Sequence, residues 1–102
     1  MIRHAALFRL HHADGSADEA DFLAALSGLA AIPGVQDFDI GREISPKNLF
    51  AFAVSMRFAD AAAYAGYNDH PDHLAFVRDR WVPEVADFME HDSVTLGPRQ
   101  PR

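Results

Sequence analysis

Residues 49–58 constrain the fold most, because they are predicted to form a β-strand that has no clear water-facing side. Alternate residues of a strand point to opposite faces of its sheet. One face of this strand carries large apolar residues, namely Phe50, Phe52, Val54, Met56 and Phe58. The other face carries smaller ones, namely Leu49, Ala51, Ala53 and Ser55. A sheet built around this strand therefore needs cover on both faces.

Two further strands and one helix are predicted before this segment. Residues 2–10 alternate as a strand, and the side chains expected on one of its faces are Ile2, His4, Ala6, Phe8 and Leu10. Ser16 and Glu19 match the capping box that opens a helix, and apolar residues continue at helical spacing until Pro33. Residues 35–44 form another extended segment, which Gly41 interrupts.

A broken helix and a last strand are predicted after it. Asp60 is the expected N-cap of a helix that runs toward Tyr67, and Pro71 forces a break at His70 before it opens a further helix. We expect the buried stripe of that further helix to consist of Leu74, Val77 and Trp81. The chain extends again after Pro83, and the last strand is expected to include Phe88, Val94 and Leu96.

The order of these elements predicts an α+β fold of the ferredoxin-like βαββαβ type. Such a monomer has a four-stranded antiparallel sheet with its helices on one face. We expect one domain over residues 1–97 and a flexible tail at residues 98–102. Because residues 49–58 are apolar on both faces, the face without helices is expected to pack against a second copy of the chain. The pattern therefore predicts a homodimer.

The charge and the cysteine content exclude several classes of function. The chain has 9 basic and 15 acidic residues, and its formal net charge of -6 disfavours nucleic acid and anionic membranes as partners. It contains no cysteine, which rules out disulfides, thiolate catalysis and Cys-ligated metals. No apolar stretch approaches the roughly 20 residues of a membrane-spanning helix. We therefore expect a cytoplasmic protein.

Four segments together resemble the stress-responsive dimeric α/β-barrel family, also called the Dabb domain. They are MIRH at residues 1–4, IPGV at 32–35, GRE at 41–43 and YNDHPDHLAF at 67–76. The most specific piece is the His-Pro-x-His motif that follows a tyrosine. The resemblance covers nearly the whole chain, and it implies a homodimer whose two sheets close into a barrel.

The same resemblance implies a candidate site. Some family members resemble polyketide cyclases whose pocket is lined by a first-strand histidine and by the second histidine of the motif. Here these positions are His4 and His73, and Tyr67 is a third pocket group. A neutral imidazole can abstract a proton next to a carbonyl, so His73 is the candidate base, with Tyr67 or His4 holding the developing enolate. An aldol-type ring closure or another lyase-like step of this kind needs no cofactor.

The rest of the predicted pocket is apolar and suits a small hydrophobic or aromatic ligand. The residues expected to line it are Phe8, Phe22, Leu26, Leu74, Val77 and Trp81. The direction of the pKa shift of His73 stays open, because the dipole of the helix opened by Pro71 disfavours the charged ring whereas Asp69 and Asp72 favour it. No metal site is predicted, since Pro71 separates His70 from His73.

Structural alternatives exist for each of these residues. His4 is also consistent with a core histidine that bonds a backbone carbonyl or Tyr67, and His70 with a cap at the helix break. The loop with His11 and His12 could take up zinc or nickel adventitiously. At the level of function, the alternatives are a non-catalytic dimer that contributes to stress tolerance and, by analogy of fold, a monooxygenase-like barrel.

Overall fold

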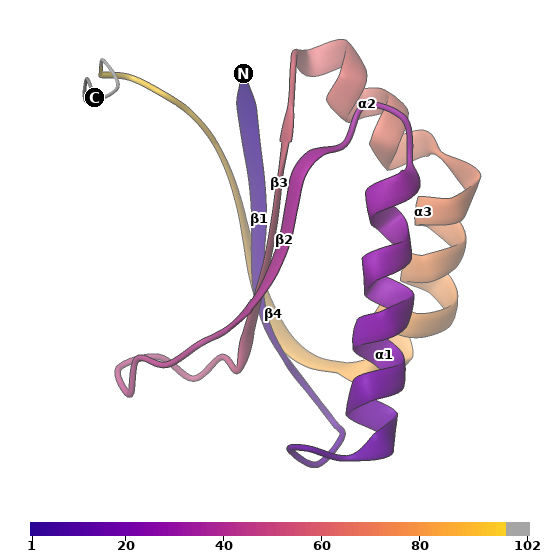
Figure 1. Cartoon of the computed structure of the whole chain (residues 1–102), viewed down its shortest axis with the longest axis vertical. Coiled ribbons are helices and arrows are strands. Elements are labelled where there is room, and N and C mark those ends of the chain that lie inside the picture. Colours follow the sequence, from indigo (N-terminus) through magenta and orange to yellow (C-terminus); the bar gives the residue numbers. More distant parts are fainter. Residues whose placement is uncertain (98–102) are drawn as a thin grey trace.

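The computed structural model describes residues 1–97 and shows an antiparallel sheet with helices packed on one face (Figure 1). The strands are β1 (Ile2–Leu10), β2 (Gln36–Arg42), β3 (Phe52–Phe58) and β4 (Val85–Val94). The helical segments are α1 (Ala17–Ser27), the 3-10 turn η1 (Gly28–Ala31), α2 (Ala61–Asp69), α3 (Pro71–Phe76), the π-helical turn η2 (Val77–Trp81) and α4 (Val82–Glu84). The predicted tail, residues 98–102, lies outside the described residues.

The strand order in the sheet is β2-β3-β1-β4, with β1 in a central position. β1 pairs antiparallel with both β3 and β4. His4 therefore stands opposite Met56 on one side and Asp92 on the other. This arrangement confirms the ferredoxin-like fold with a four-stranded antiparallel sheet.

The hydrophobic core lies between the helices and one face of the sheet. Phe8 of β1, Phe22 of α1 and Phe58 of β3 are completely buried. The ring of Phe8 lies 5.9 Å from that of Phe22 and 5.4 Å from that of Phe52, measured between centroids. Aromatic pairs at this spacing add to the stabilisation that burial itself provides. They hold α1 against the sheet.

α1 begins at the predicted cap. The hydroxyl oxygen of Ser16 accepts a hydrogen bond from the backbone N–H of Glu19 at 3.1 Å. The carboxylate of Glu19 does not return to Ser16, as in a standard capping box, but accepts from the backbone N–H of Gly15 at 3.2 Å. It also accepts from Arg42 of β2 at 3.2 Å, so this buried carboxylate ties the start of α1 to the sheet.

The break between α2 and α3 lies where Pro71 predicted it. Asp60 caps α2 by accepting from the N–H of Ala63 at 2.9 Å. His70 leaves the helical conformation, with φ -64° and ψ 135°, as expected for a residue before proline. Its Nδ1 accepts from the N–H of Asp72 at 3.1 Å, so His70 caps α3. The interpretation of His70 as a cap is confirmed.

Three predicted strand ends are wrong in detail. Ile44, Leu49 and Leu96 lie outside the strands and are 91%, 83% and 97% exposed, because they extend beyond the paired part of the sheet. β2 also continues through Gly41, which pairs with Ala53. Its irregularity lies instead between Gln36 and Asp39, where Asp37 has a positive φ of 51°.

The predicted buried stripe of the third helix needs a correction at Leu74, which is 53% exposed. The residue that α3 buries in the core is Phe76. Only six residues follow the break before α3 passes into the π-helical turn η2, so one helical period does not run from residue 71 to 81. Trp81 at the end of η2 still packs on the core, with its ring 5.1 Å from that of Phe8.

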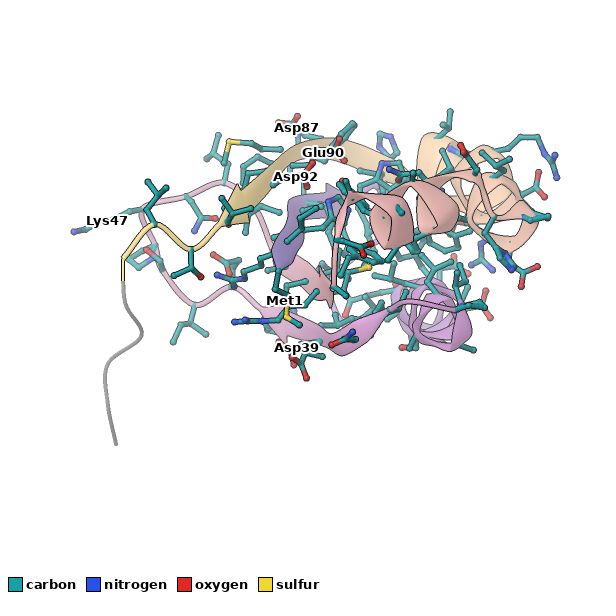
Figure 2. The ribbon with its side chains drawn as sticks, turned by 90° about the horizontal axis from the view of Figure 1, so that it is seen from above. Met1, Asp39, Lys47, Asp87, Glu90 and Asp92 are labelled. Carbon is teal, nitrogen blue, oxygen red and sulfur yellow. The ribbon has the colours of Figure 1, made fainter. Side chains whose placement is uncertain are left out.

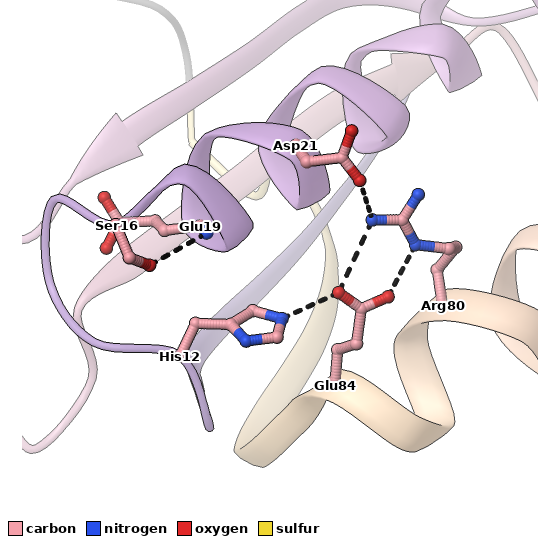
Figure 3. Close-up of polar contacts among 6 residues, drawn as sticks. All are labelled: His12, Ser16, Glu19, Asp21, Arg80 and Glu84. Atoms are coloured by element: carbon pink, nitrogen blue, oxygen red, sulfur yellow. Dashed lines mark hydrogen bonds and ion pairs between the residues drawn. The ribbon is translucent and has the colours of Figure 1, made fainter.

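An ionic network holds the end of this helical segment in place (Figure 3). Arg80 donates to Asp21 of α1 at 2.8 Å and also bonds Glu84. Glu84 in turn lies 2.7 Å from Nε2 of His12, just after β1. The network therefore fixes the residues on either side of Trp81 against α1 and β1.

The other face of the sheet carries no helix (Figure 1). The residues of β3 on this face are half-buried, whereas those on the helix face are buried. Ala53 pairs with Leu7 of β1 on one side and with Gly41 of β2 on the other, so the residues at the centre of this face are small or apolar. The loop between β2 and β3 projects on this same side of the sheet.

Candidate functional site

A cavity of about 520 Å³ lies between the helices and the part of the sheet that contains β1, β3 and β4. This volume falls in the range of small-molecule sites. Most of its lining is apolar and comes from Ala6, Leu26, Leu29, Val54, Met56, Phe76, Val77, Trp81, Val82, Val85 and Phe88. The polar and hydroxyl-bearing lining residues are His4, Tyr64, Tyr67, Asn68, His73 and Glu90.

His4 is held by a carboxylate on the neighbouring strand. Its Nδ1 lies 2.6 Å from Oδ1 of Asp92, the residue directly opposite in the β1–β4 register. Tyr64 donates its hydroxyl to the same carboxylate at 2.9 Å. An ionised carboxylate only accepts hydrogen bonds, so in the neutral ring Nδ1 of His4 carries the proton and Nε2 keeps a lone pair.

His73 has the same arrangement, although a different group holds it. Its Nδ1 lies 3.0 Å from the backbone oxygen of Asn68 in α2. A carbonyl oxygen only accepts, so Nδ1 donates, and Nε2 of the neutral ring is again an acceptor. Both cavity-lining imidazoles therefore keep Nε2 free of the bonds that fix their rings.

Tyr67 lies between the two histidines. Its ring centroid is 6.2 Å from that of His4 and 4.5 Å from that of His73. The side chain is buried, yet within residues 1–97 no hydrogen bond engages its hydroxyl. No fully buried polar side-chain atom of the described residues lacks a partner, so this hydroxyl must reach the cavity. The structure thus brings His4, Tyr67 and His73 together at one cavity.

Sequence and structure comparisons place this arrangement among known proteins. The family model for the stress responsive A/B barrel domain, Dabb, matches residues 2–95. The chain belongs to the Dabb family. A comparison with curated proteins gives no match for this Dabb domain.

Solved structures share the fold of this Dabb domain. A Dabb family protein from Mesorhizobium loti with a ferredoxin-like fold is 58% identical, with 94% of this chain and 97% of that chain covered and a TM-score of 0.91. A dimeric ferredoxin-like protein of unknown function from Thermobifida fusca is 30% identical over 92% and 90% of the two chains, with a TM-score of 0.76. A hydroxynitrile lyase from Passiflora edulis is 16% identical over 96% of each chain, with a TM-score of 0.82, and shows likeness of fold alone.

The environment of the Dabb cavity keeps both tyrosines protonated. Burial raises the pKa of Tyr64 well above its ordinary value, and the hydrogen bond to Asp92 with the charges of Asp92 and Glu90 raises it further. Burial also raises the pKa of Tyr67, again with the help of Glu90. Both hydroxyls are therefore hydrogen-bond donors at neutral pH.

The same environment keeps His73 neutral. Burial lowers the pKa of His73 below its ordinary value of 6.5. The hydrogen bond to the carbonyl of Asn68 and the charge of Glu90 raise the pKa of His73, whereas nearby His4 lowers it. The net direction, which the sequence left open, is downward, so at pH 7 His73 can accept a proton.

The structure places three of the six predicted apolar lining residues at the cavity. Leu26, Val77 and Trp81 line the cavity of this Dabb domain. Phe8 and Phe22 do not, because both are fully enclosed in the core and present no surface to a ligand. Leu74 does not either, because it points to solvent from α3.

Four polar residues of the site were not identified from the sequence. They are Tyr64, Asn68, Glu90 and Asp92. A signal for Tyr64 was its position three residues before Tyr67, which places both on one face of a helix. Glu90 and Asp92 follow Phe88 at alternate positions, and so they share one face of β4.

The described part of this Dabb domain contains no metal-binding arrangement of three or more His, Asp or Glu side chains. In the loop after β1, His12 bonds Glu84. Among the helices of residues 1–97, none combines the length and the apolar composition needed to cross a membrane.

Proposed function

We propose that this Dabb chain is a homodimeric, cofactor-independent enzyme of the lyase or cyclase type, acting on a small and largely apolar carbonyl compound. The observation that carries the proposal is the pair of imidazoles at one cavity, each with Nδ1 engaged and Nε2 left as an acceptor. The unpaired hydroxyl of Tyr67 between them supplies a donor. A base and a donor at an apolar cavity are the elements that enolate chemistry requires.

In the proposed reaction His73 is the base. Its Nε2 takes a proton from the carbon next to the carbonyl, the C–H electron pair becomes the C=C bond of the enolate, and the π pair of the carbonyl moves to its oxygen. Tyr67 donates a hydrogen bond to the enolate oxygen that forms. The enolate carbon then attacks a second carbonyl to close a ring, and the alkoxide that forms takes up the proton held by His73. The same steps in reverse break a C–C bond. His4, oriented by Asp92, is the second group that positions the substrate.

The homodimer is part of the proposal. The sheet face without helices has small or apolar residues at its centre, and an apolar face of this kind needs cover. The Thermobifida fusca protein, which shares 30% identity and the fold, is described as dimeric. We propose that two open sheet faces of this chain pack together to close a barrel. A cytoplasmic location remains the prediction made from the cysteine-free sequence.

A second candidate function has its own supporting observation. The bonds among His4, Asp92 and Tyr64 join β1, β4 and α2, so this polar cluster also contributes to the fold. A non-catalytic dimer that binds a small hydrophobic ligand would retain the cluster for that reason alone.

Proton exchange in D2O separates the two candidates, because it needs only the first step of the reaction. The probes are small aromatic ketones such as phenylacetone, and NMR follows the loss of the protons next to the carbonyl. We expect the wild-type protein to accelerate exchange and H73Q to slow it by about 100-fold, the usual contribution of a positioned base. H11Q, a change in the exposed loop away from the cavity, should behave as wild type.

Two results would contradict the proposed enzymatic mechanism. One is exchange by folded H73Q at the wild-type rate, since His73 would then not be the base. The other is wild-type exchange no faster than in buffer across the ketone series, which supports the non-catalytic dimer.

A further inference from the structure

Among residues 1–97, the lining of the cavity contains one acidic residue, Glu90, and no Lys or Arg. Glu90 lies on β4 opposite Ala6, and Asp92 follows it on the same face of the strand. Figure 2 shows both side chains along β4. A ligand in the cavity therefore meets the carboxylate of Glu90, with no Lys or Arg of the described residues beside it.

Glu90 differs from the other acidic residues around the site. Asp92 is engaged by His4 and Tyr64, and Glu84 by Arg80 and His12. The carboxylate of Glu90 has no hydrogen bond or ion pair within residues 1–97, although its charge acts on Tyr64, Tyr67 and His73. Glu90 is an exposed residue that borders the cavity, and its unpaired charge favours a cation over an anion there, most strongly at low ionic strength.

The aromatic lining favours the same sign of charge. Aromatic residues from three elements line the cavity, namely Tyr64 and Tyr67 of α2, Trp81 of η2 and Phe88 of β4. The ring of Trp81 stands edge-on to that of Phe88, with centroids 5.5 Å apart. The faces of such rings attract ammonium groups, and tryptophan does so most strongly. A carboxylate and aromatic rings are the groups that bind organic cations in proteins.

We propose that the cavity selects a small aromatic or alkyl compound that carries a protonated amine, with the ammonium group placed at Glu90. The inference rests on the proposed function, which it deepens: a substrate with both groups is an amino ketone, whose ammonium meets Glu90 while its carbonyl meets Tyr67 and His73. Compounds that carry a carboxylate or a phosphate are disfavoured by the charge of Glu90. Glu90 is thus the residue that determines which charge the site accepts.

Three probes of matched shape test this selection by their charge. They are phenethylamine, which is cationic, 2-phenylethanol, which is neutral, and 3-phenylpropanoate, which is anionic. Binding can be followed by tryptophan fluorescence, because Trp81 is the only tryptophan of the chain and lines the cavity. At low ionic strength we expect the amine to bind about ten-fold more tightly than the alcohol, and the carboxylate more weakly than both.

Variants locate the origin of the preference. E90Q should bring the affinity for the amine down to that for the alcohol and leave the affinity for the alcohol unchanged. E43Q removes the same charge in the loop between β2 and β3, outside the cavity, and should keep the preference of the wild type.

The possible failures are distinguishable. If the alcohol binds but the carboxylate binds as tightly as the amine, or if E90Q keeps the preference, the proposed selection by charge is wrong and the ligand site stands. If none of the three probes binds, both the selection and the ligand-binding function proposed for the cavity are contradicted.

Discussion

The carboxylate of Asp92 lies 2.6 Å from Nδ1 of His4, directly across the β1–β4 pairing. The same carboxylate accepts the hydroxyl of Tyr64, so one side chain of an edge strand orients two groups of the cavity. Asp92 itself does not line the cavity. It acts on the site through His4, whose ring it holds with Nε2 as the free acceptor.

D92N should weaken both bonds, because an amide cannot accept from His4 and Tyr64 as a carboxylate does. The side chain of Asp92 is 45% exposed, so we expect a modest loss of about 1 kcal/mol in the free energy of unfolding. Urea denaturation measures this loss. D14N, a matched change in an exposed loop, is the control. Equal stability of D92N and D14N would show that the bonds do not hold the fold.

The two tyrosines should respond differently to removal of their hydroxyls. Y64F removes the donor to Asp92 and should lower the free energy of unfolding by about 1 kcal/mol. Y67F removes a hydroxyl that has no partner within residues 1–97, so stability should change little. Proton exchange of a ketone should instead slow by about 100-fold in Y67F, because the enolate loses its donor. A Y67F protein that is destabilised but catalyses normally would contradict this division.

The lowered pKa of His73 should appear in the dependence of stability on pH. The unfolded state binds a proton near the ordinary pKa of 6.5, whereas the folded state binds it only at lower pH. The contribution is therefore intact above pH 6.5 and is lost as the pH falls toward the folded pKa. H73Q lacks this group, so its stability should fall less than that of wild type between neutral and mildly acidic pH. Parallel stability curves for the two proteins would contradict the shift.

A charge on the open sheet face should dissociate the homodimer. Ala53 lies at the centre of that face, opposite Leu7 and Gly41. In A53R a large charged side chain must enter the packed interface, so we expect the dimer dissociation constant to rise by about 100-fold. Light scattering after gel filtration measures the mass. A24R, on the exposed side of α1, should remain dimeric. A monomeric wild type would contradict the proposed homodimer, and a dimeric A53R at low concentration would place the interface elsewhere.

The elements, the sheet face of His4 and the cap by His70 were predictable because the signals for them are local, whereas His73 was named as a site residue through the family resemblance. Alternation along residues 2–10 put His4 on the core face, and Pro71 located the break that ends α2 and caps α3 with His70. Both depend only on neighbouring residues in the chain. The same holds for the cap of α1 by Ser16.

The partners of those histidines were not predictable in the same way. Asp92 meets His4 through the register of β4 on β1, 88 positions apart in the chain. That register depends on the packing of the whole sheet rather than on either strand. Phe8 and Leu26 show the related problem for the cavity. Both are apolar and on the core side, and only packing decides that Phe8 is enclosed while Leu26 borders empty space.

The most direct test of the account is the protonation of His4 and His73, observed by ¹⁵N NMR of the imidazole rings at pH 7. We expect the His73 ring to be neutral, with the proton on Nδ1 and none on Nε2, and Nδ1 of His4 to carry the proton that faces Asp92. H73Q and H4Q should each remove the signals of one ring. A proton on Nε2 of His73, or a charged ring at that pH, would leave the cavity without its base and contradict the proposed chemistry.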